Sequence, residues 1–148
     1  MSETGEKDPH NLQRFVDAQN RVFAEVCSEL REGRKRGHWM WFIFPQLQGL
    51  GYSPMAQRFA ISSLEEARAY LKHPILGPRL RECCRLVTLI QDSPIEEIFS
   101  DPDHMKFRSS MTLFAHATPE KQIFTSALDK YFKGGFDACS LPWRPSRL

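Results

Sequence analysis

The chain has 148 residues, of which 41% are hydrophobic and 26% charged, and its formal net charge is +2. This composition excludes a disordered protein, and the length favours one domain with a core of its own. A charge this small gives no electrostatic argument for a nucleic-acid partner. Residues 1–7 are polar and lack the apolar stretch of a secretion signal, and no apolar run approaches the roughly 20 residues of a membrane span. The sequence therefore predicts a soluble, cytoplasmic protein that has no membrane partner, with residues 1–7 as a disordered tail and 8–148 as a single domain.

The first predicted helix begins at Asn11. Its apolar residues recur at intervals of three and four as far as Leu30, and Gly33 provides a stop signal. The basic residues that follow, between Arg31 and Arg36, favour the negative end of the helix dipole. A phosphate-binding role for this cluster is the alternative.

The later helices are predicted from their start signals. Four pairs place a capping side chain before proline, and Ser63 with Glu66 forms a capping box. Helices are expected to begin near Pro54, Leu64, Pro94, Pro102 and Pro119, and another is expected to follow Gly77-Pro78. The last apolar stripe, from Ile123 to Phe132, precedes Gly134-Gly135. The run from Trp39 to Phe44 is interpreted as helix or turn, because a single strand has no partner. The expected fold is all-α, with about seven mostly short helices packed irregularly.

Cysteine and acidic residues give no metal or redox signature. The cysteines, Cys27, Cys83, Cys84 and Cys139, form no CxxC motif and lack zinc-finger spacing. We interpret them as reduced thiols buried like small hydrophobic groups. The carboxylates are scattered without the spacing of glycosidase or metal sites, and neither HExxH nor a glycine-rich phosphate loop occurs. No metal and no cofactor are predicted.

Several motifs make the chain similar to a known family. A tryptophan-rich run and a serine-rich run carry most of the resemblance, with shorter segments elsewhere: His38–Leu47, Ser109–Phe114, Arg14-Phe15, Ala18-Gln19, Gly49–Gly51, Ala69–Leu71, His73-Pro74 and Leu76-Gly77. The chain resembles a mainly bacterial family catalogued as a domain of unknown function, whose members are often labelled calpastatin-like. The resemblance implies an all-helical single domain and supplies no activity. Calpastatin inhibits as an unstructured chain, whereas this composition is that of a packed globule.

The tryptophan-rich run supplies the first candidate site residues. His38 is a candidate general acid or base, and the alternative is a capping or partly buried histidine. Trp39 and Trp41 offer faces on which a base or nicotinamide ring could stack, and the alternative is an aromatic core. Gln46 or Ser53 is the expected partner for a buried indole N–H.

The second group of candidates lies on the predicted helix after Pro102. Lys106, Arg108, Ser109 and Ser110 combine cations with hydroxyl groups, which suits a phosphate or carboxylate. In the alternative, Arg108 pairs with an acidic residue and the serines bond to their own helix. We expect His38 or Gln46 to share one positive pocket with Arg108, Ser109 or Ser110.

Three functions remain open from the sequence. The first is a small-molecule site for a phosphate- or carboxylate-bearing ligand, such as a nucleotide or ADP-ribose-like molecule. The second is a non-catalytic protein-interaction module with a helical groove. The third, an RNA-associated role through Arg31–Arg36, ranks last. The sequence decides neither whether the protein is an enzyme nor its oligomeric state.

Overall fold

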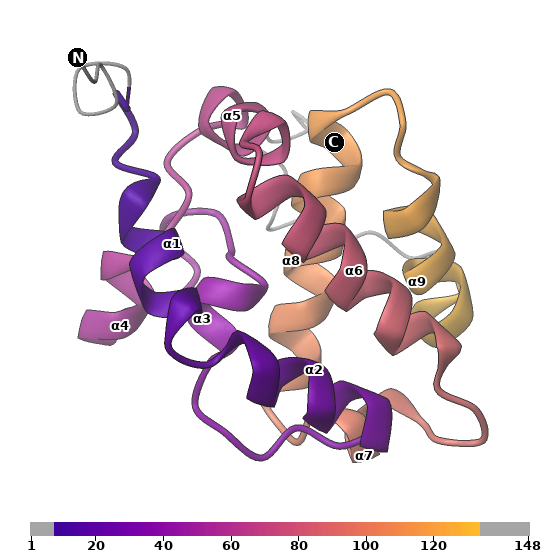
Figure 1. Ribbon diagram of the computed structural model, residues 1–148. Coiled ribbons are helices and arrows are strands. Elements are labelled where there is room, and N and C mark those ends of the chain that lie inside the picture. Colours follow the sequence, from indigo (N-terminus) through magenta and orange to yellow (C-terminus); the bar gives the residue numbers. More distant parts are fainter. Residues whose placement is uncertain (1–7, 134–148) are drawn as a thin grey trace.

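The structure, a computed structural model, describes residues 8–133, and that part of the chain is all-helical (Figure 1). Its nine helices are α1 Gln13–Asn20, α2 Phe23–Glu32, α3 Met40–Ile43, α4 Pro54–Arg58, α5 Leu64–Lys72, α6 Leu76–Leu89, α7 Ile95–Ile98, α8 Asp103–Ala117 and α9 Gln122–Phe132. The all-α prediction is confirmed, and the helices pack irregularly. The sequence predicted about seven helices. The described part has two more because the first predicted helix is divided into α1 and α2, and because the run from Trp39 to Phe44 contains α3. The predicted disordered tail and the Gly134-Gly135 stop lie outside the described residues.

The predicted N-terminal helix is broken between Asn20 and Phe23, so the prediction of one long helix was wrong. Val22, at φ −132°, leaves the helical conformation before α2 begins. Asparagine and valine are weak helix formers, so a break at these residues costs little helix-forming free energy. The break lets α1 pack against α3 while α2 packs against α6. Gly33 ends α2 as predicted, in the left-handed conformation at φ +83°.

Only some of the predicted helix caps form. Ser53 Oγ accepts the Ala56 N–H and Ser63 Oγ accepts the Glu66 N–H, each at 3.1 Å. Helices α7 and α8 begin directly after Pro94 and Pro102, as expected, but without a side-chain cap. Helix α9 begins at Gln122, later than the predicted Pro119. The four cap–proline pairs therefore mark turns reliably, whereas the capping bond itself forms at Ser53.

Helix α6 begins at Leu76, before the predicted Gly77-Pro78 start, because His73 caps it. His73 Nδ1 accepts the backbone N–H groups of Ile75 at 3.0 Å and Leu76 at 3.2 Å. A ring nitrogen that accepts two N–H groups carries no proton, so the neutral imidazole holds its proton on Nε2. His73 is thus a structural residue whose remaining nitrogen is a hydrogen-bond donor.

The core is organised around α8, which passes through the middle of Figure 1 and packs against α5, α7 and α9. Most of its residues are buried, as expected of a helix enclosed on several sides. Aromatic rings fill the space beside it: Phe107 meets Phe44 edge-on at 5.0 Å, and Phe114 contacts Tyr70 at 5.3 Å. Phe42 and Phe44 are buried, whereas Trp41 is half-buried.

The end of α6 is completed by side chains of α9. Lys130 Nζ donates to the carbonyl oxygens of Thr88 and Ile90, and Tyr131 donates to that of Val87 at 2.7 Å. The last carbonyls of a helix lack partners within it, so these bonds supply what α6 cannot. Burial raises the pKa of Tyr131 to about 12, which keeps its hydroxyl a donor at neutral pH.

None of the helices in residues 8–133 combines the length and the apolar character needed to cross a membrane.

Candidate functional site

The two predicted site segments do pack together. Lys106 Nζ lies 5.1 Å from the centre of the Trp41 ring, and Phe44 meets Phe107. Asp103 lies between two cations, with Oδ2 at 2.8 Å from Lys35 Nζ and Oδ1 at 3.6 Å from Lys106 Nζ. We call the five residues Lys35, Trp39, Trp41, Asp103 and Lys106 the Trp41–Lys106 surface. It carries two positive charges and one negative charge against two indole rings.

Trp39 is a structural member of that surface. It is 2% exposed, and its indole N–H donates to Glu29 Oε1 at 2.9 Å rather than to the expected Gln46 or Ser53. The same oxygen accepts the backbone N–H groups of Arg36 at 2.7 Å and Gly37 at 3.0 Å. Burial raises the pKa of the Glu29 carboxyl, but these three hydrogen bonds and Lys35 outweigh it and hold the pKa below its usual value. Glu29 thereby fixes the turn that leads into α3.

His38 and Gln46 lie at the two ends of this segment. His38 is exposed, and within residues 8–133 its ring makes no hydrogen bond or ion pair. Gln46 is half-buried, and its backbone carbonyl accepts the Ile61 N–H at 2.8 Å in an isolated parallel bridge between Leu47 and Ile61. This β-bridge was not predicted from the sequence, and it lies just after the run from Trp39 to Phe44.

The remaining candidates on α8 face other elements. The Arg108 guanidinium lies 5.5 Å from the centre of the Phe132 ring on α9, away from Trp41. Ser109 and Ser110 are buried, and Ser110 Oγ has no hydrogen-bond partner among residues 8–133. Residues two apart on a helix lie about 200° apart, which separates Lys106 from Arg108. Arg108 therefore lies on another side of α8 from Lys106, and none of the eight predicted site residues lines any of the cavities described below.

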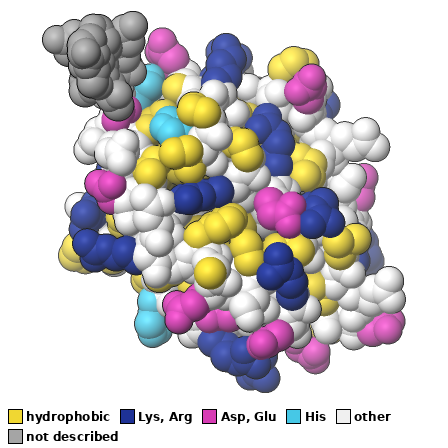
Figure 2. Space-filling model, in the orientation of Figure 1, with side chains coloured by type: hydrophobic (Ala, Val, Ile, Leu, Met, Phe, Trp, Pro, Cys, Tyr) yellow, Lys and Arg dark blue, Asp and Glu magenta, His cyan; other side chains and the backbone are white. Residues whose placement is uncertain are grey.

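A large groove lies instead between the segment before α1 and helix α5. It encloses about 780 Å³ and is lined by Asp8, Pro9, His10, Leu12, Gln13, Glu65, Arg68, Ala69, Lys72, His73 and Pro74. Ligand pockets are typically of roughly 300–1,000 Å³, with an apolar lining and a few polar groups. Figure 2 shows histidine and hydrophobic side chains side by side in the region of α1 and α5. We call this cavity the N-terminal groove.

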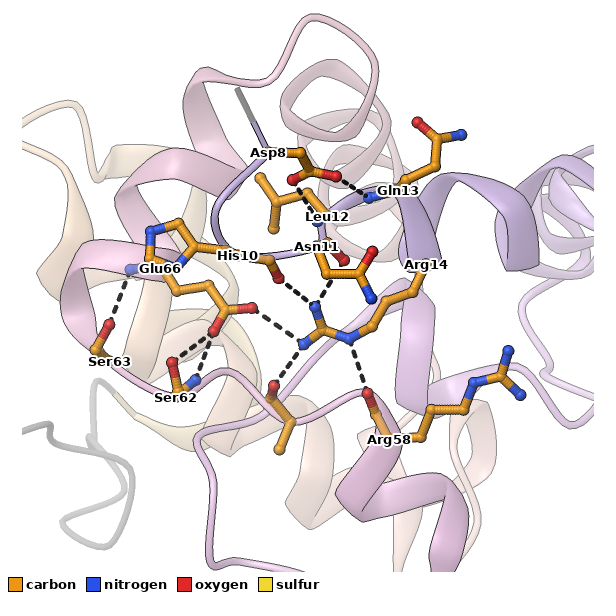
Figure 3. Close-up of polar contacts among 11 residues, drawn as sticks. Asp8, His10, Asn11, Leu12, Gln13, Arg14, Arg58, Ser62, Ser63 and Glu66 are labelled. Carbon is orange, nitrogen blue, oxygen red and sulfur yellow. Dashed lines mark hydrogen bonds and ion pairs between the residues drawn. The ribbon is translucent and has the colours of Figure 1, made fainter. Parts of the chain in front are cut away.

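An arginine on α1 holds the two walls of the groove together (Figure 3). Arg14 Nη1 donates to the carbonyl oxygens of His10 at 2.6 Å and Asn11 at 2.8 Å. Its Nη2 donates to Ala60 O at 2.8 Å and to Glu66 Oε2 on α5 at 3.0 Å, and its Nε donates to Arg58 O at 2.8 Å. All five N–H groups of the guanidinium are used. The first wall is therefore fixed to α5 by a residue that lies outside the cavity.

Glu66, the acidic partner of Arg14, and the segment before α1 are themselves held by hydrogen bonds. Glu66 is 3% exposed, and its Oε1 accepts the N–H of Ser62 at 2.8 Å and its hydroxyl at 2.7 Å. Asp8 caps α1, accepting the N–H groups of Leu12 at 2.7 Å and Gln13 at 3.1 Å. The groove is thus preformed, and the oxygens of Asp8 are already occupied.

A second cavity adjoins the first at Arg68. It encloses about 270 Å³ and is lined by Arg68, Ala115, His116, Ala117, Thr118, Pro119 and Lys121, at the end of α8 and the loop that follows. We call the two cavities together the double groove. Their lining carries three cations, Arg68, Lys72 and Lys121, and two carboxylates, Asp8 and Glu65.

Sequence reasoning did not identify the double groove. The available signal was the i, i+4 pair of cations on α5, Arg68 and Lys72. Such a pair is common on any exposed helix, so the spacing alone does not distinguish a site. Within residues 8–133 no group of three or more histidine, cysteine or acidic side chains is arranged to hold a metal ion.

Comparisons with known proteins give a family and a fold. Residues 9–142 match the family described as "Protein of unknown function (DUF1810)". The structure is similar to the crystal structure of the conserved hypothetical protein Rv1873 from Mycobacterium tuberculosis, with a TM-score of 0.89 and 60% sequence identity. The match covers 90% of this chain and 95% of that chain. No curated protein matches the sequence significantly.

Proposed function

The chain belongs to the DUF1810 family of proteins of unknown function, and we propose that it binds an anionic small molecule in the double groove. The observation that carries the proposal is Arg68, which lines both cavities and lies between them. A planar guanidinium binds two oxygens of one phosphate or carboxylate together. A molecule with a central anionic group and two end groups suits two cavities that meet at one arginine.

The surroundings of Arg68 support a phosphate-bearing ligand. Lys72 and Lys121 add positive charge on either side, and His73 offers only a hydrogen-bond donor, because its Nδ1 caps α6. Pro9, Leu12, Ala69 and Pro74 give the larger cavity apolar walls against which a base or sugar ring would pack. An ADP-ribose-like molecule, with a diphosphate between two ring systems, has this form. The proposal keeps the predicted cytoplasmic location, where phosphorylated metabolites are found.

The Trp41–Lys106 surface is the second location that we propose for an anion. Its two lysines share Asp103, Lys35 also lies near the Glu29 carboxylate, and the Lys106 ammonium lies over the half-buried Trp41 ring. His38 stays a candidate acid or base there, with Gln46 nearby in sequence. Arg108, which lies about 200° around α8 from Lys106, and the buried Ser109 and Ser110 are proposed only as part of a separate anion contact. The double groove has the stronger support because it is hollow.

The other two functions receive less support. A peptide-binding module is favoured by Ile75, which is 40% exposed directly after the groove residue Pro74. An RNA-binding role would need the cations of the Arg31–Arg36 cluster to be free. Lys35 instead pairs with Asp103 and Arg36 pairs with Glu32, so part of that charge is neutralised.

Thermal unfolding in the presence of ADP-ribose, ADP, adenosine and inorganic phosphate tests the proposal. We expect the diphosphates to stabilise the protein and adenosine to have no effect. A ligand at 100 times its Kd stabilises a protein by about 2.7 kcal/mol. Arg68→Ala should abolish the stabilisation, whereas the control Arg85→Ala, on an exposed arginine of α6 paired with Glu82, should keep it.

Two different results would contradict anion binding in the double groove. Stabilisation that survives Arg68→Ala and disappears in Lys106→Ala would move the site to the Trp41–Lys106 surface. The absence of stabilisation by every phosphate compound would reject the anion-binding function and leave the peptide-binding module.

A further inference from the structure

Helices α2 and α6 lie side by side and run in the same direction. Near the start of α2, the Phe23 ring lies 4.9 Å from the Arg79 guanidinium of α6. At the end of α2, a Cβ placed on Gly33 would lie 3.5 Å from Ile90 Cγ2, at the end of α6. Residues early in α2 therefore contact residues early in α6, and residues at the end of α2 contact the end of α6, so the two helices are parallel. Cys27 and Cys83 lie one turn after Phe23 and Arg79, which places the two cysteines opposite each other.

The two thiols face each other across this helix contact. Both residues are buried, with Cys27 7% exposed and Cys83 1% exposed. The neighbouring Cys83 thiol lowers the pKa of Cys27 to about 7 against the opposing effect of burial, and Arg31 and Arg79 act in the same direction. The neighbouring Cys27 thiol and burial raise the pKa of Cys83. The pair therefore consists of one thiol prone to ionise, with a small opening to solvent, and one protonated thiol beside it.

The neighbouring Cys84 provides the contrast. It points to the other side of α6, where its thiol lies 3.5 Å from Met111 Sδ, and it is fully buried. Burial raises its pKa. A cysteine in apolar surroundings is inert, whereas a thiolate next to cations is the form that reacts with oxidants.

We propose that Cys27 and Cys83 form a peroxide-sensitive thiol pair that closes to a disulfide between α2 and α6. In the first step the Cys27 thiolate attacks the peroxide, so that an S–O bond forms and the O–O bond breaks. Cys27 becomes a sulfenic acid, oxidised by two electrons, and hydrogen peroxide is reduced to water after taking up a proton. The Cys83 sulfur then attacks Cys27, and the S–O bond breaks as the S–S bond forms. The hydroxyl leaves as water with the proton of the Cys83 thiol.

This pairing was not predicted from the sequence, from which the cysteines were interpreted as reduced, buried thiols, with a redox role as the less favoured alternative. Cys27 and Cys83 are far apart in the chain and share no motif. The parallel packing of α2 and α6 brings them together, and it does not depend on the proposed anion site.

The test treats the full-length, unmodified chain with stoichiometric hydrogen peroxide at neutral pH and maps the products by mass spectrometry under non-reducing conditions. We expect peptides containing Cys27 and Cys83 to appear as one linked species that has lost two hydrogen atoms, and dithiothreitol to restore them. Cys84 should remain unmodified. A link that involves Cys84 or Cys139 in place of this pair, or no link at all, would overturn the proposal.

Variants separate the two steps. Cys83→Ser should leave Cys27 as a sulfenic acid that dimedone traps, whereas the matched control Cys84→Ser should still form the disulfide. Trapping at Cys27 that is equal in Cys83→Ser and in the unmodified chain would show that Cys83 does not resolve the sulfenic acid. Near-ultraviolet circular dichroism checks that each variant is folded, and the mapping of the unmodified chain needs no variant.

Discussion

Arg14 Nη2 and Glu66 Oε2 form a largely buried ion pair at 3.0 Å between α1 and α5, which are 52 residues apart at this contact. The side chains are 15% and 3% exposed, and each makes further hydrogen bonds. Removing one partner of such a pair leaves the other charge without compensation in the interior. The pair therefore holds the fold and the wall of the N-terminal groove at the same place.

We expect Glu66→Ala to lower the free energy of unfolding by about 3–5 kcal/mol, because it strands the Arg14 guanidinium and the Ser62 donors. Urea unfolding measures this loss. The control is Glu82→Ala, which removes the exposed pair with Arg85 and should cost about 0–1 kcal/mol. Equal losses for the two variants would contradict the structural role of Glu66.

Phe44→Ala should cost about 3–5 kcal/mol of unfolding free energy. Phe44 is fully buried, and its ring meets both Phe99 and Phe107. Tyr52→Ala, at a side chain that is 83% exposed in the following loop, serves as the control and should change stability little. Chemical denaturation of both variants decides the matter, and a Phe44→Ala protein as stable as the control would show that this ring does not support the core.

Gly77→Ala should destabilise the protein even though it lies inside α6. Alanine is preferred to glycine in a helix by about 1 kcal/mol. A Cβ at this position would, however, lie 2.2 Å from the backbone oxygen of Leu71, which no side-chain rotation can relieve. The steric effect should outweigh the helix preference and lower the thermal unfolding midpoint. A raised midpoint would mean that α5 and α6 can separate at this contact without cost.

Glu29 should make a pH-dependent contribution to stability. Its pKa in the folded state is below the usual 4.5, so its contribution is complete above 4.5 and is lost as the pH falls through the folded-state pKa. At neutral pH we expect Glu29→Gln to be less stable than the unmodified protein, and the difference should shrink in acid. Glu25→Gln, on the exposed side of the same helix, is the control. A difference that stays constant into acid would show that the Glu29 charge is not involved.

Much of the fold follows from local sequence, and the exceptions have tertiary causes. Ser53 and Ser63 cap their helices because the acceptor and the donor lie three residues apart, a relationship that any helix start repeats. The break between α1 and α2 has another origin. Gln19 is buried and donates to Phe42 O at 2.7 Å and Tyr70 Oη at 3.0 Å, two partners that only the folded chain brings together. The apolar spacing continues across the break and conceals it.

The candidate site was harder to predict than the fold. The aromatic run and the α8 cations do meet, at Trp41 and Lys106, because both segments are anchored in the core. The double groove depends on Arg14, four of whose five acceptors are backbone carbonyls, two of them, on Arg58 and Ala60, far away in the sequence. Every residue has a backbone carbonyl, so the residue types in a sequence do not indicate which carbonyls accept a hydrogen bond from Arg14. The cavity therefore follows from the packing of α1 on α5 and from no motif.

The bonds from Lys130 and Tyr131 to the end of α6 also bear on how the protein is made. Lys130 follows its acceptor Thr88 by 42 residues, and Tyr131 follows Val87 by 44. A ribosome synthesises the chain from the N-terminus, so α6 emerges well before the helix that completes it. Until α9 follows, the last carbonyls of α6 and the apolar side of α8 face water. The core of the nascent protein therefore closes only after its last described helix, α9, has been synthesised.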